Sequence, residues 1–371
     1  MKSKFEIVLL VLSLTFTLSL TACSQGKIKP PDTPANKETP ESAERESGKN
    51  ASVEVLAEGL RTPWALDFQG STMYVSEREG TIAKIEGTSV KRQEVRLRKP
   101  LLSEGEGGFL GFVLAPDFTV SKLAFAYHTY KDNGTVWNRV VVLKENAGGW
   151  TEQQALLERI PGSLNHNGGR LALGPDKQLY VTTGDSNVPD LAQDLSSLAG
   201  KILRMTPDGQ VPKDNPFPES YVYSYGHRNS QGIAWTSDGA MYASEHGPSG
   251  SPAGHDEMNR IQAGANYGWP LVIGDERREG MLPPLYHTGR EAIAPSGIAI
   301  GGNGPIYVAA LRGEALFRYE PETKSINAVL QHAGRLRDVK VHGGYVYVLT
   351  NNTDGRGVPK AGDDRLMRMK E

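Results

Sequence analysis

Residues 169–183 read Gly-Arg-Leu-Ala-Leu-Gly-Pro-Asp-Lys-Gln-Leu-Tyr-Val-Thr-Thr, and this stretch decides the fold. It contains a short apolar segment, a turn with Gly, Pro and Asp, and a second segment rich in Tyr and Val. Glycine, proline and aspartate favour turns, whereas β-branched and aromatic residues favour strands. The stretch therefore predicts two strands joined by a turn.

The same pattern occurs six times from Ala51 onward, and a third strand follows in most copies. The first strands begin near Pro63, Gly111, Gly169, Gly232, Gly297 and Arg337. The second strands are predicted at 73–75, 125–127, 179–181, 241–243, 306–308 and 346–348. Single units of this kind cannot bury both faces, so they stack around one axis.

The repetition therefore predicts an all-β fold, a six-bladed β-propeller. A β-sandwich is the main alternative, but it does not account for six copies. Short helical turns are expected only at 147–157 and 191–195.

The composition of the chain narrows the possible functions. The 371 residues carry a formal net charge of -2, which gives no sign of a nucleic-acid surface. The 42 Gly and 23 Pro suit a protein rich in strands and turns. Cys23 is the single cysteine, so an intrachain disulfide is excluded.

The N-terminal segment resembles the signal of a bacterial lipoprotein. Lys2 and Lys4 precede an apolar run at 7–20, which ends in Leu-Thr-Ala-Cys at 20–23. The resemblance implies that residues 1–22 are a cleaved signal peptide and that Cys23 carries lipid. The alternative is an ordinary secretory signal that contains a cysteine. Either way, we expect the mature protein outside the cytoplasm, and the lipid would anchor it to the cell membrane.

Residues 23–50 are predicted to form a lipid-anchored disordered linker. From Ser24 to Asn50 the chain is rich in Pro, Glu, Ser and Lys and has almost no large apolar residues, so it cannot bury a core. As a flexible coil it would span about 30 Å. Residues 51–371 are then the propeller domain.

A histidine and an aspartate flank the strand pair quoted above. His166 lies in the polar turn 164–170, and Asp185 directly follows the second strand. Antiparallel strands would bring both side chains to one end of a sheet. A carboxylate can fix the histidine tautomer and stabilise its protonated form, which makes a general base. The alternative is a loop histidine that hydrogen-bonds to a backbone carbonyl.

Four further polar clusters start or end predicted strands in other copies of the repeat. They lie at 225–232, at 244–248 with 256–259 and 264–270, at 310–313, and at 335–338. They can converge on the central axis, where Arg228, Arg312, Arg335 and Arg337 would form a cationic pocket for a polycarboxylate or phosphate. The alternative is that these arginines pair with acids on neighbouring blades.

In these clusters the chain resembles the soluble, pyrroloquinoline-quinone (PQQ)-dependent aldose sugar dehydrogenases, the glucose/sorbosone dehydrogenase family. The resemblance covers about residues 53–370. The motifs that carry it are Gly-His-Arg-Asn-Ser-Gln-Gly at 226–232, Gly247-Pro248, Asp256-Glu257, Asn-Tyr-Gly-Trp-Pro at 266–270 and Arg-Leu-Arg-Asp-Val at 335–339. It implies a six-bladed propeller that oxidises the anomeric hydroxyl of aldoses to lactones and passes electrons to an acceptor that the sequence does not identify.

The resemblance also implies roles for individual residues. His166 would be the general base, Asp185 would orient it, and Arg228 would lie near the reacting quinone carbonyl. The other residues implied in cofactor binding are Glu106, Asn229, Arg312, Arg335 and Arg337. The backbone carbonyls of Gly247 and Pro248 would hold a calcium ion that polarises the quinone, since calcium prefers oxygen ligands. In some relatives Glu257 and Tyr267 would serve a second calcium ion.

The chain departs from the family pattern at three places. Glu106 stands where relatives often have Gln, and a carboxylate beside an anionic quinone is unfavourable unless it is paired or protonated. Arg312 stands where many relatives have Lys. Residues 291–293 read Glu-Ala-Ile, without the hydroxyl or aromatic residues of some relatives.

Two other functions remain open from the sequence. One is a calcium-dependent propeller hydrolase such as a lactonase, which needs several side-chain carboxylates or amides around its metal. The other is a non-catalytic surface lipoprotein that binds sugars or a partner protein through the propeller face.

Overall fold

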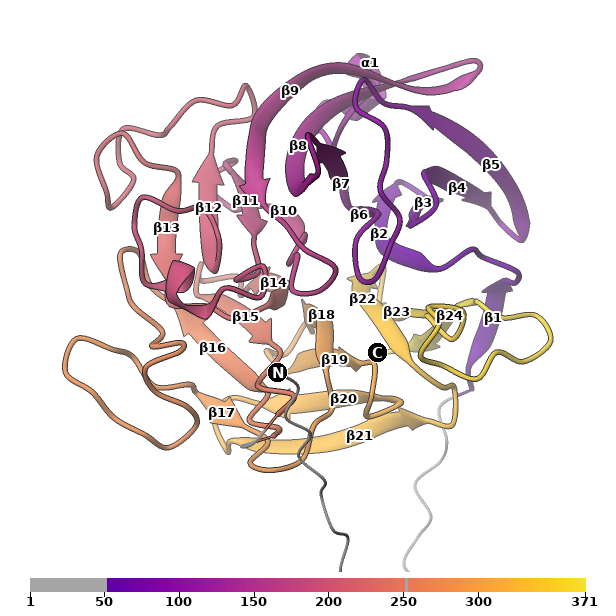
Figure 1. Cartoon of the computed structure of the whole chain (residues 1–371). Coiled ribbons are helices and arrows are strands. Elements are labelled where there is room, and N and C mark those ends of the chain that lie inside the picture. The colour runs from indigo at the N-terminus through magenta and orange to yellow at the C-terminus, as the bar shows by residue number, and fades with distance from the viewer. Residues whose placement is uncertain (1–51, 251–252) are drawn as a thin grey trace, which may run out of the picture. The chain divides into compact units, whose positions relative to one another are not determined.

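The structure is a computed structural model that describes residues 52–250 and 253–371. The predicted signal peptide, the lipid at Cys23 and the linker lie outside the described residues. The described part folds into five sheets, whose strands are mainly antiparallel. Four of them have four strands each, and the fifth has eight strands that divide into two blades, which makes six blades (Figure 1).

The first three blades use the strands β2 to β13. Blade 1 contains β2 (Pro63–Gln69), β3 (Thr72–Glu77), β4 (Thr81–Glu86) and β5 (Ser89–Arg96). Blade 2 contains β6 (Phe109–Leu114), β7 (Leu123–Asp132), β8 (Thr135–Asn146) and β9 (Gly149–Pro161). Blade 3 contains β10 (Leu171–Leu173), β11 (Leu179–Thr182), β12 (Lys201–Met205) and β13 (Val222–Tyr225).

The last three blades use the remaining strands. Blade 4 contains β14 (Ser230–Trp235), β15 (Met241–Glu245), β16 (Glu257–Ile261) and β17 (Tyr286–His287). Blade 5 contains β18 (Pro295–Ile300), β19 (Ile306–Ala310), β20 (Ala315–Glu320) and β21 (Ser325–Gln331). Blade 6 contains β22 (Leu336–His342), β23 (Tyr345–Thr350), β24 (Leu366–Lys370) and, at its outer edge, β1 (Glu54–Ala57).

The six blades form a closed ring. The first strand of each blade contacts the first strand of the next, and β22 of blade 6 contacts β2 of blade 1. In Figure 1 the blades follow one another around the axis in chain order, from indigo β2 to yellow β24. The all-β, six-bladed prediction is confirmed, and all six predicted first strands and all six predicted second strands exist.

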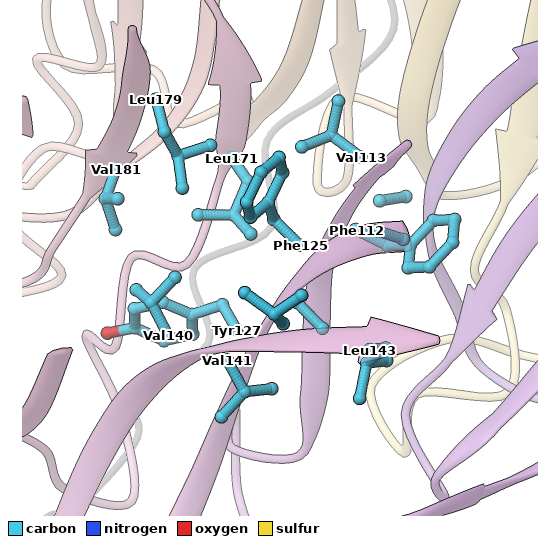
Figure 2. Close-up of a cluster of buried hydrophobic side chains, with 14 of the residues drawn as sticks. Phe112, Val113, Phe125, Tyr127, Val140, Val141, Leu143, Leu171, Leu179 and Val181 are labelled. Carbon is cyan, nitrogen blue, oxygen red and sulfur yellow. The ribbon is translucent and has the colours of Figure 1, made fainter. Parts of the chain in front are cut away.

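The core lies between neighbouring blades rather than inside any one of them. One buried cluster reaches from blade 1 to blade 3 and includes Phe125 and Val140 of blade 2 with Leu171 and Val181 of blade 3. Figure 2 shows these side chains meeting between the two blades. Tyr127 of the same cluster donates its hydroxyl proton to the Asn167 carbonyl at 2.9 Å, which ties the core to the turn that carries His166.

The helical expectations were only partly right. Residues 147–157 form most of strand β9, so that prediction was wrong. The 3₁₀ helix η1 (Pro189–Ala192) overlaps the second expected segment, and a one-turn helix α1 (Phe118–Ser121) was missed. In β9, Trp150 packs against Tyr74 of blade 1 and Phe112 of its own blade, and these tertiary contacts override local helix propensity. Within the described residues, no helix is long and apolar enough to cross a membrane.

Candidate active site

The predicted site residues gather at one end of the central axis, because they occupy corresponding positions in their blades. Glu106, His166, Arg228 and Arg335 each come just before the first strand of a blade. Asp185 comes just after a second strand. First and second strands are antiparallel, so the start of one and the end of the other share the same edge.

A small pocket lies at this end, and all six blades or the turns that lead into them contribute to it. Its lining residues are Trp64, Glu106, Asn167, Gly168, Gln231, His246, Leu311, Arg337 and Arg356. A larger cavity of about 480 Å³ lies at the opposite mouth of the axis, along the later residues of the first strands. Among the described residues that line this second cavity, none is a predicted site residue.

His166 is held between a carboxylate and a guanidinium. Its Nδ1 lies 2.7 Å from Oδ1 of Asp185, and its Nε2 lies 2.9 Å from Nη2 of Arg228. Arg228 can only donate, so Nε2 accepts and the proton of the neutral ring is on Nδ1. This is the tautomer that leaves a lone pair on Nε2, on the side of the ring that faces Arg228.

Asp185 is itself fully constrained. Its side chain is 1% exposed, Oδ2 accepts the indole proton of Trp269 at 2.9 Å, and Oδ1 also accepts the backbone N–H of Asn187 at 2.9 Å. The Trp269 ring also lies under the Arg228 guanidinium, with 5.5 Å between the ring centroid and the guanidinium carbon. Trp269 therefore connects the two partners of His166.

The backbone of His166 adopts a conformation that is unusual for a residue with a side chain. Its φ is +57°, in the left-handed region. The carbonyl accepts from Ser186 N at 3.2 Å, and the N–H donates to Oε2 of Glu106 at 2.9 Å. A Cβ at Gly184 would lie 1.9 Å from the His166 oxygen, so only glycine fits there. The surrounding residues thus hold His166 in this conformation.

Glu106 is ionised and paired. Its Oε1 accepts from Nη1 of Arg356 at 2.7 Å. Burial raises the pKa of the carboxyl, but His246 (protonated in the acidic range), Arg356 and the His166 N–H together lower it to about 2. The Glu106 carboxylate is therefore not a lone charge, because Arg356 supplies its counter-charge. The sequence alone did not point to Arg356.

Arg335 and Arg337 point to the same side of the chain, as their alternation with Leu336 predicts. The Nη2 atom of each arginine faces Oδ2 of Asp354, at 2.7 Å from Arg335 and at 4.0 Å from Arg337. Asp354 belongs to the same blade, in the loop between β23 and β24. Arg337 also donates to Oε1 of Gln231 at 2.8 Å. Arg335 therefore pairs with an acid, but with one of its own blade and not of a neighbouring blade, which the alternative had expected.

Two buried polar atoms at the site have no hydrogen-bond partner among the described residues. They are Nδ2 of Asn229 and Nε2 of His246. The other end of the Asn229 amide is used, since Oδ1 accepts from Gly168 N at 3.0 Å. Burial lowers the pKa of His246 to about 4, against the effects of Asp256 and Glu106, so the ring is neutral at pH 7. A bound water, ion or ligand can supply the missing partner of such buried atoms.

The residues predicted to bind calcium use several of their polar groups in hydrogen bonds within the chain. The Pro248 carbonyl accepts from Gly254 N at 3.1 Å, and the Gly247 N–H donates to Asp256 at 2.8 Å. Burial and the facing Glu245 raise the pKa of Glu257 to about 8. Tyr267 uses its hydroxyl on the Arg260 carbonyl. In the described part of the chain, no group of three or more His, Cys, Asp or Glu side chains could hold a metal.

Arg312 is not brought into the pocket. Its side chain is exposed, and it is the preceding residue, Leu311, that lines the pocket and accepts from Arg335 through its carbonyl at 3.3 Å. Residues next to each other at a strand end point in different directions, so one of the two faces solvent. The structure therefore gives no support to Arg312 as a cofactor ligand.

Sequence reasoning missed Arg78, His246, Asp354 and Arg356 as site residues and gave Trp269 no role. Arg78 is buried and donates to the carbonyls of Gly105 and Gly107, which shapes the turn that carries Glu106. Charged residues within glycine-rich turns, as in Asp-Gly-Arg-Gly at 354–357, were the signal that could have found Asp354 and Arg356.

Comparison with known proteins gives a consistent result. The family model described as Glucose / Sorbosone dehydrogenase matches residues 60–366. The aldose sugar dehydrogenase YliI of Escherichia coli is 30% identical over 349 residues, covering 82% of this chain and 91% of that protein. Quinoprotein glucose dehydrogenase B of Acinetobacter calcoaceticus is 29% identical over 307 residues, covering 72% of this chain and 63% of that protein.

A solved structure agrees with these relatives. The PQQ-bound form of an aldose sugar dehydrogenase from Streptomyces coelicolor matches with a TM-score of 0.79 and 39% identity. The match covers 86% of this chain and 98% of the Streptomyces chain.

Proposed function

Because the chain belongs to the glucose/sorbosone dehydrogenase family, we propose that it is a PQQ-dependent sugar dehydrogenase that oxidises the anomeric hydroxyl of aldoses to lactones. The Streptomyces relative is PQQ-bound, and the Acinetobacter relative is a quinoprotein glucose dehydrogenase. PQQ supplies, when bound, the acceptor for the two electrons of the oxidation.

The observation that carries the proposal is the environment of His166. Asp185 holds the proton on Nδ1, so the lone pair is on Nε2. In the structure this lone pair accepts from Arg228, and a substrate hydroxyl would take the place of that contact when it gives up its proton. In the reaction the hydroxyl proton would pass to Nε2 and the hydrogen on the anomeric carbon would leave as hydride, with its two electrons taken up by the bound quinone, so that the carbon–oxygen bond becomes the lactone carbonyl. The Asp185 carboxylate stabilises the imidazolium that results.

The residues present fit a polycarboxylate quinone. Arg228, Arg335 and Arg337 lie at the pocket or next to it, and guanidinium groups bind carboxylates in a planar, bidentate way. The unpartnered Nδ2 of Asn229 and Nε2 of His246 are further polar atoms with no partner from the described residues. We propose that these five residues hold the cofactor, with Arg228 at the end nearest His166.

We also propose that calcium takes part, with the carbonyls of Gly247 and Pro248 as ligands. The support is their place next to the site: the carbonyl of the preceding His246 accepts from Arg228 at 3.1 Å. Two carbonyls cannot complete the six to eight oxygen ligands of calcium, so the cofactor and water must supply the others. The proposed roles of Glu257 and Tyr267 at a second ion rest on the family resemblance alone.

Reconstitution tests the proposal. Purified protein is incubated with PQQ and calcium, passed through a gel-filtration column, and assayed by dye reduction with a panel of aldoses. We expect retained quinone absorbance and turnover of at least one aldose. Lactone hydrolysis without quinone would favour the hydrolase alternative, and sugar binding by calorimetry without turnover would favour a binding protein.

A further inference from the structure

Three turns from distant parts of the chain meet at Glu106. This residue lies between β5 and β6, Asn165 and His166 lie between β9 and β10, and Arg356 lies between β23 and β24. Oε2 of Glu106 accepts from His166 N at 2.9 Å, and Oε1 accepts from Nη1 of Arg356 at 2.7 Å. Nη2 of Arg356 donates to Oδ1 of Asn165 at 3.1 Å and closes the triangle.

Glu106 is held firmly from its own side as well. Its N–H donates to the Leu164 carbonyl at 2.7 Å, and Arg78 binds the carbonyls of the two glycines that flank it. A Cβ at Gly105 would lie 2.2 Å from the Leu164 oxygen, so the two turns are in direct backbone contact. The carboxylate is therefore a fixed anchor and not a mobile surface group.

Arg356 is the outer member of this group. Its side chain is 55% exposed, whereas the Glu106 side chain is 18% exposed. Among the described residues that line the pocket, Arg356 alone is exposed, and the others are buried or half-buried. Arg356 is therefore the part of the pocket lining that faces solvent most.

We propose that Glu106 and Arg356 form a bridge that positions His166 for catalysis, with Glu106 as the positioning residue and Arg356 as the group that fixes it at the pocket mouth. The left-handed backbone of His166 is costly for a residue with a Cβ. Of its two backbone hydrogen bonds, the one from its N–H depends on Glu106. Loss of that bond frees the turn to relax and turns the ring away from Asp185 and the pocket.

The activity arm of the test rests on the proposed function, so a second arm uses the protein without cofactor. Glu106→Ala removes both bonds, Glu106→Gln keeps an acceptor for His166 N but loses the ion pair, and Arg356→Lys keeps the charge. We expect kcat to fall about 10- to 100-fold in Glu106→Ala, because small misplacements of a catalytic group have effects of this size. We expect a smaller fall in kcat for Glu106→Gln. Arg356→Lys should keep most of the kcat that Arg356→Ala loses. Glu104→Gln, an exposed neighbour in the same turn, is the control.

The second arm follows the Nδ1–H proton of His166 by NMR in the cofactor-free protein. In the wild type His166 Nδ1 lies 2.7 Å from Oδ1 of Asp185, so we expect its proton to resonate far downfield. We expect the signal to broaden or shift upfield in Glu106→Ala and to persist in Glu104→Gln. An unchanged signal in a folded Glu106→Ala protein overturns the positioning role. A wild type without sugar oxidation, but with the expected NMR changes, contradicts the proposed function and leaves the bridge standing.

Discussion

The surroundings of His166 show how much of the proposed general base depends on its neighbours. A histidine in a glycine-rich turn has no fixed tautomer by itself, and here Asp185 and Arg228 fix it from both sides. Trp269 then links these two partners through its indole proton and its ring face. Each of these contacts joins residues at least 19 positions apart in the chain.

Substitution of His166 by alanine tests its role directly. We expect kcat to fall by about 10²- to 10⁴-fold, the usual contribution of a general base, while PQQ binding is retained. Steady-state dye reduction and quinone absorbance after gel filtration measure the two quantities. His332→Asn changes an exposed histidine and is the control. Equal turnover of the wild type and His166→Ala would remove His166 from the mechanism.

Trp269→Phe tests the link between Asp185 and Arg228. The ring face is retained, but the hydrogen bond to Oδ2 of Asp185 is lost. The carboxylate then turns more freely and holds His166 less well, so we expect kcat to fall about tenfold with KM little changed. A change confined to KM would instead place Trp269 in sugar binding.

The depressed pKa of Glu106 predicts a pH dependence of stability. The folded-state pKa of about 2 lies below the ordinary value of 4.5, so the ionised carboxylate stabilises the fold above pH 4.5. That contribution is lost as the pH falls from 4.5 through about 2. We expect Tm of Glu106→Gln to lie below that of the wild type at neutral pH, with the gap closing in acid. A gap that is constant from pH 7 to pH 2 would contradict the ionised state.

At the scale of elements, the outer strands of blades 1 and 2 are joined. β5 pairs in parallel with β9, with Val95 opposite Trp150, so the two blades share one sheet. Trp150 is 1% exposed, stacks on Phe118 and donates its indole proton to Gln93 at 3.0 Å. This joint explains why residues 147–157 form a strand despite their local helical pattern.

Trp150→Ala should therefore destabilise the propeller strongly. Removal of a buried tryptophan leaves a cavity and costs about 3–5 kcal/mol of the free energy of unfolding. Urea denaturation followed by circular dichroism measures the loss. Trp150→Phe, which keeps an aromatic ring and loses the hydrogen bond, should cost less. Equal midpoints for the wild type and Trp150→Ala would show that the joint is not needed for stability.

The closing strand β1 also belongs to this scale. It pairs with β24 across the two ends of the described domain, with Glu54 opposite Arg368 and an ion pair of 2.7 Å between their side chains. A chain that begins at residue 58 leaves the edge of β24 without a partner. Compared with a chain that begins at residue 52, we expect a lower Tm and more association on size-exclusion chromatography. Identical behaviour of the two chains would contradict the closing role.

At the scale of the whole molecule, the site exists only because the ring closes. The pocket takes residues from all six blades or the turns before them, and no blade contains enough of them to bind a cofactor alone. The orphan atoms of Asn229 and His246 are buried by neighbouring blades, and burial is what makes their missing partners informative. Damage to any blade is therefore expected to reach the site.

The proposed membrane anchor also belongs to this scale. We propose that the lipid is carried by Cys23, on the sequence pattern of residues 2–23. Cys23→Ser should move the protein from the membrane fraction to the soluble fraction of the cell and abolish labelling with radioactive palmitate. Lack of label on the wild type would contradict the anchor.

The sequence by itself determined the fold and most residues of the candidate site. The period-two pattern and the turn residues recur in every blade, and local patterns of this kind are visible in one dimension. His166 and Asp185 were also predictable together, because they flank one pair of adjacent strands.

Only the tertiary structure decided which charges meet at the axis. The partners of Glu106 and Arg335 are Arg356 and Asp354, two residues of one loop in the last blade. In the structure Arg312 is also exposed to solvent, and residues 147–157 lie mostly in strand β9. Contacts across 250 positions, such as Glu106 with Arg356, leave no period in the sequence. They arise when the ring closes and brings the last blade against the first.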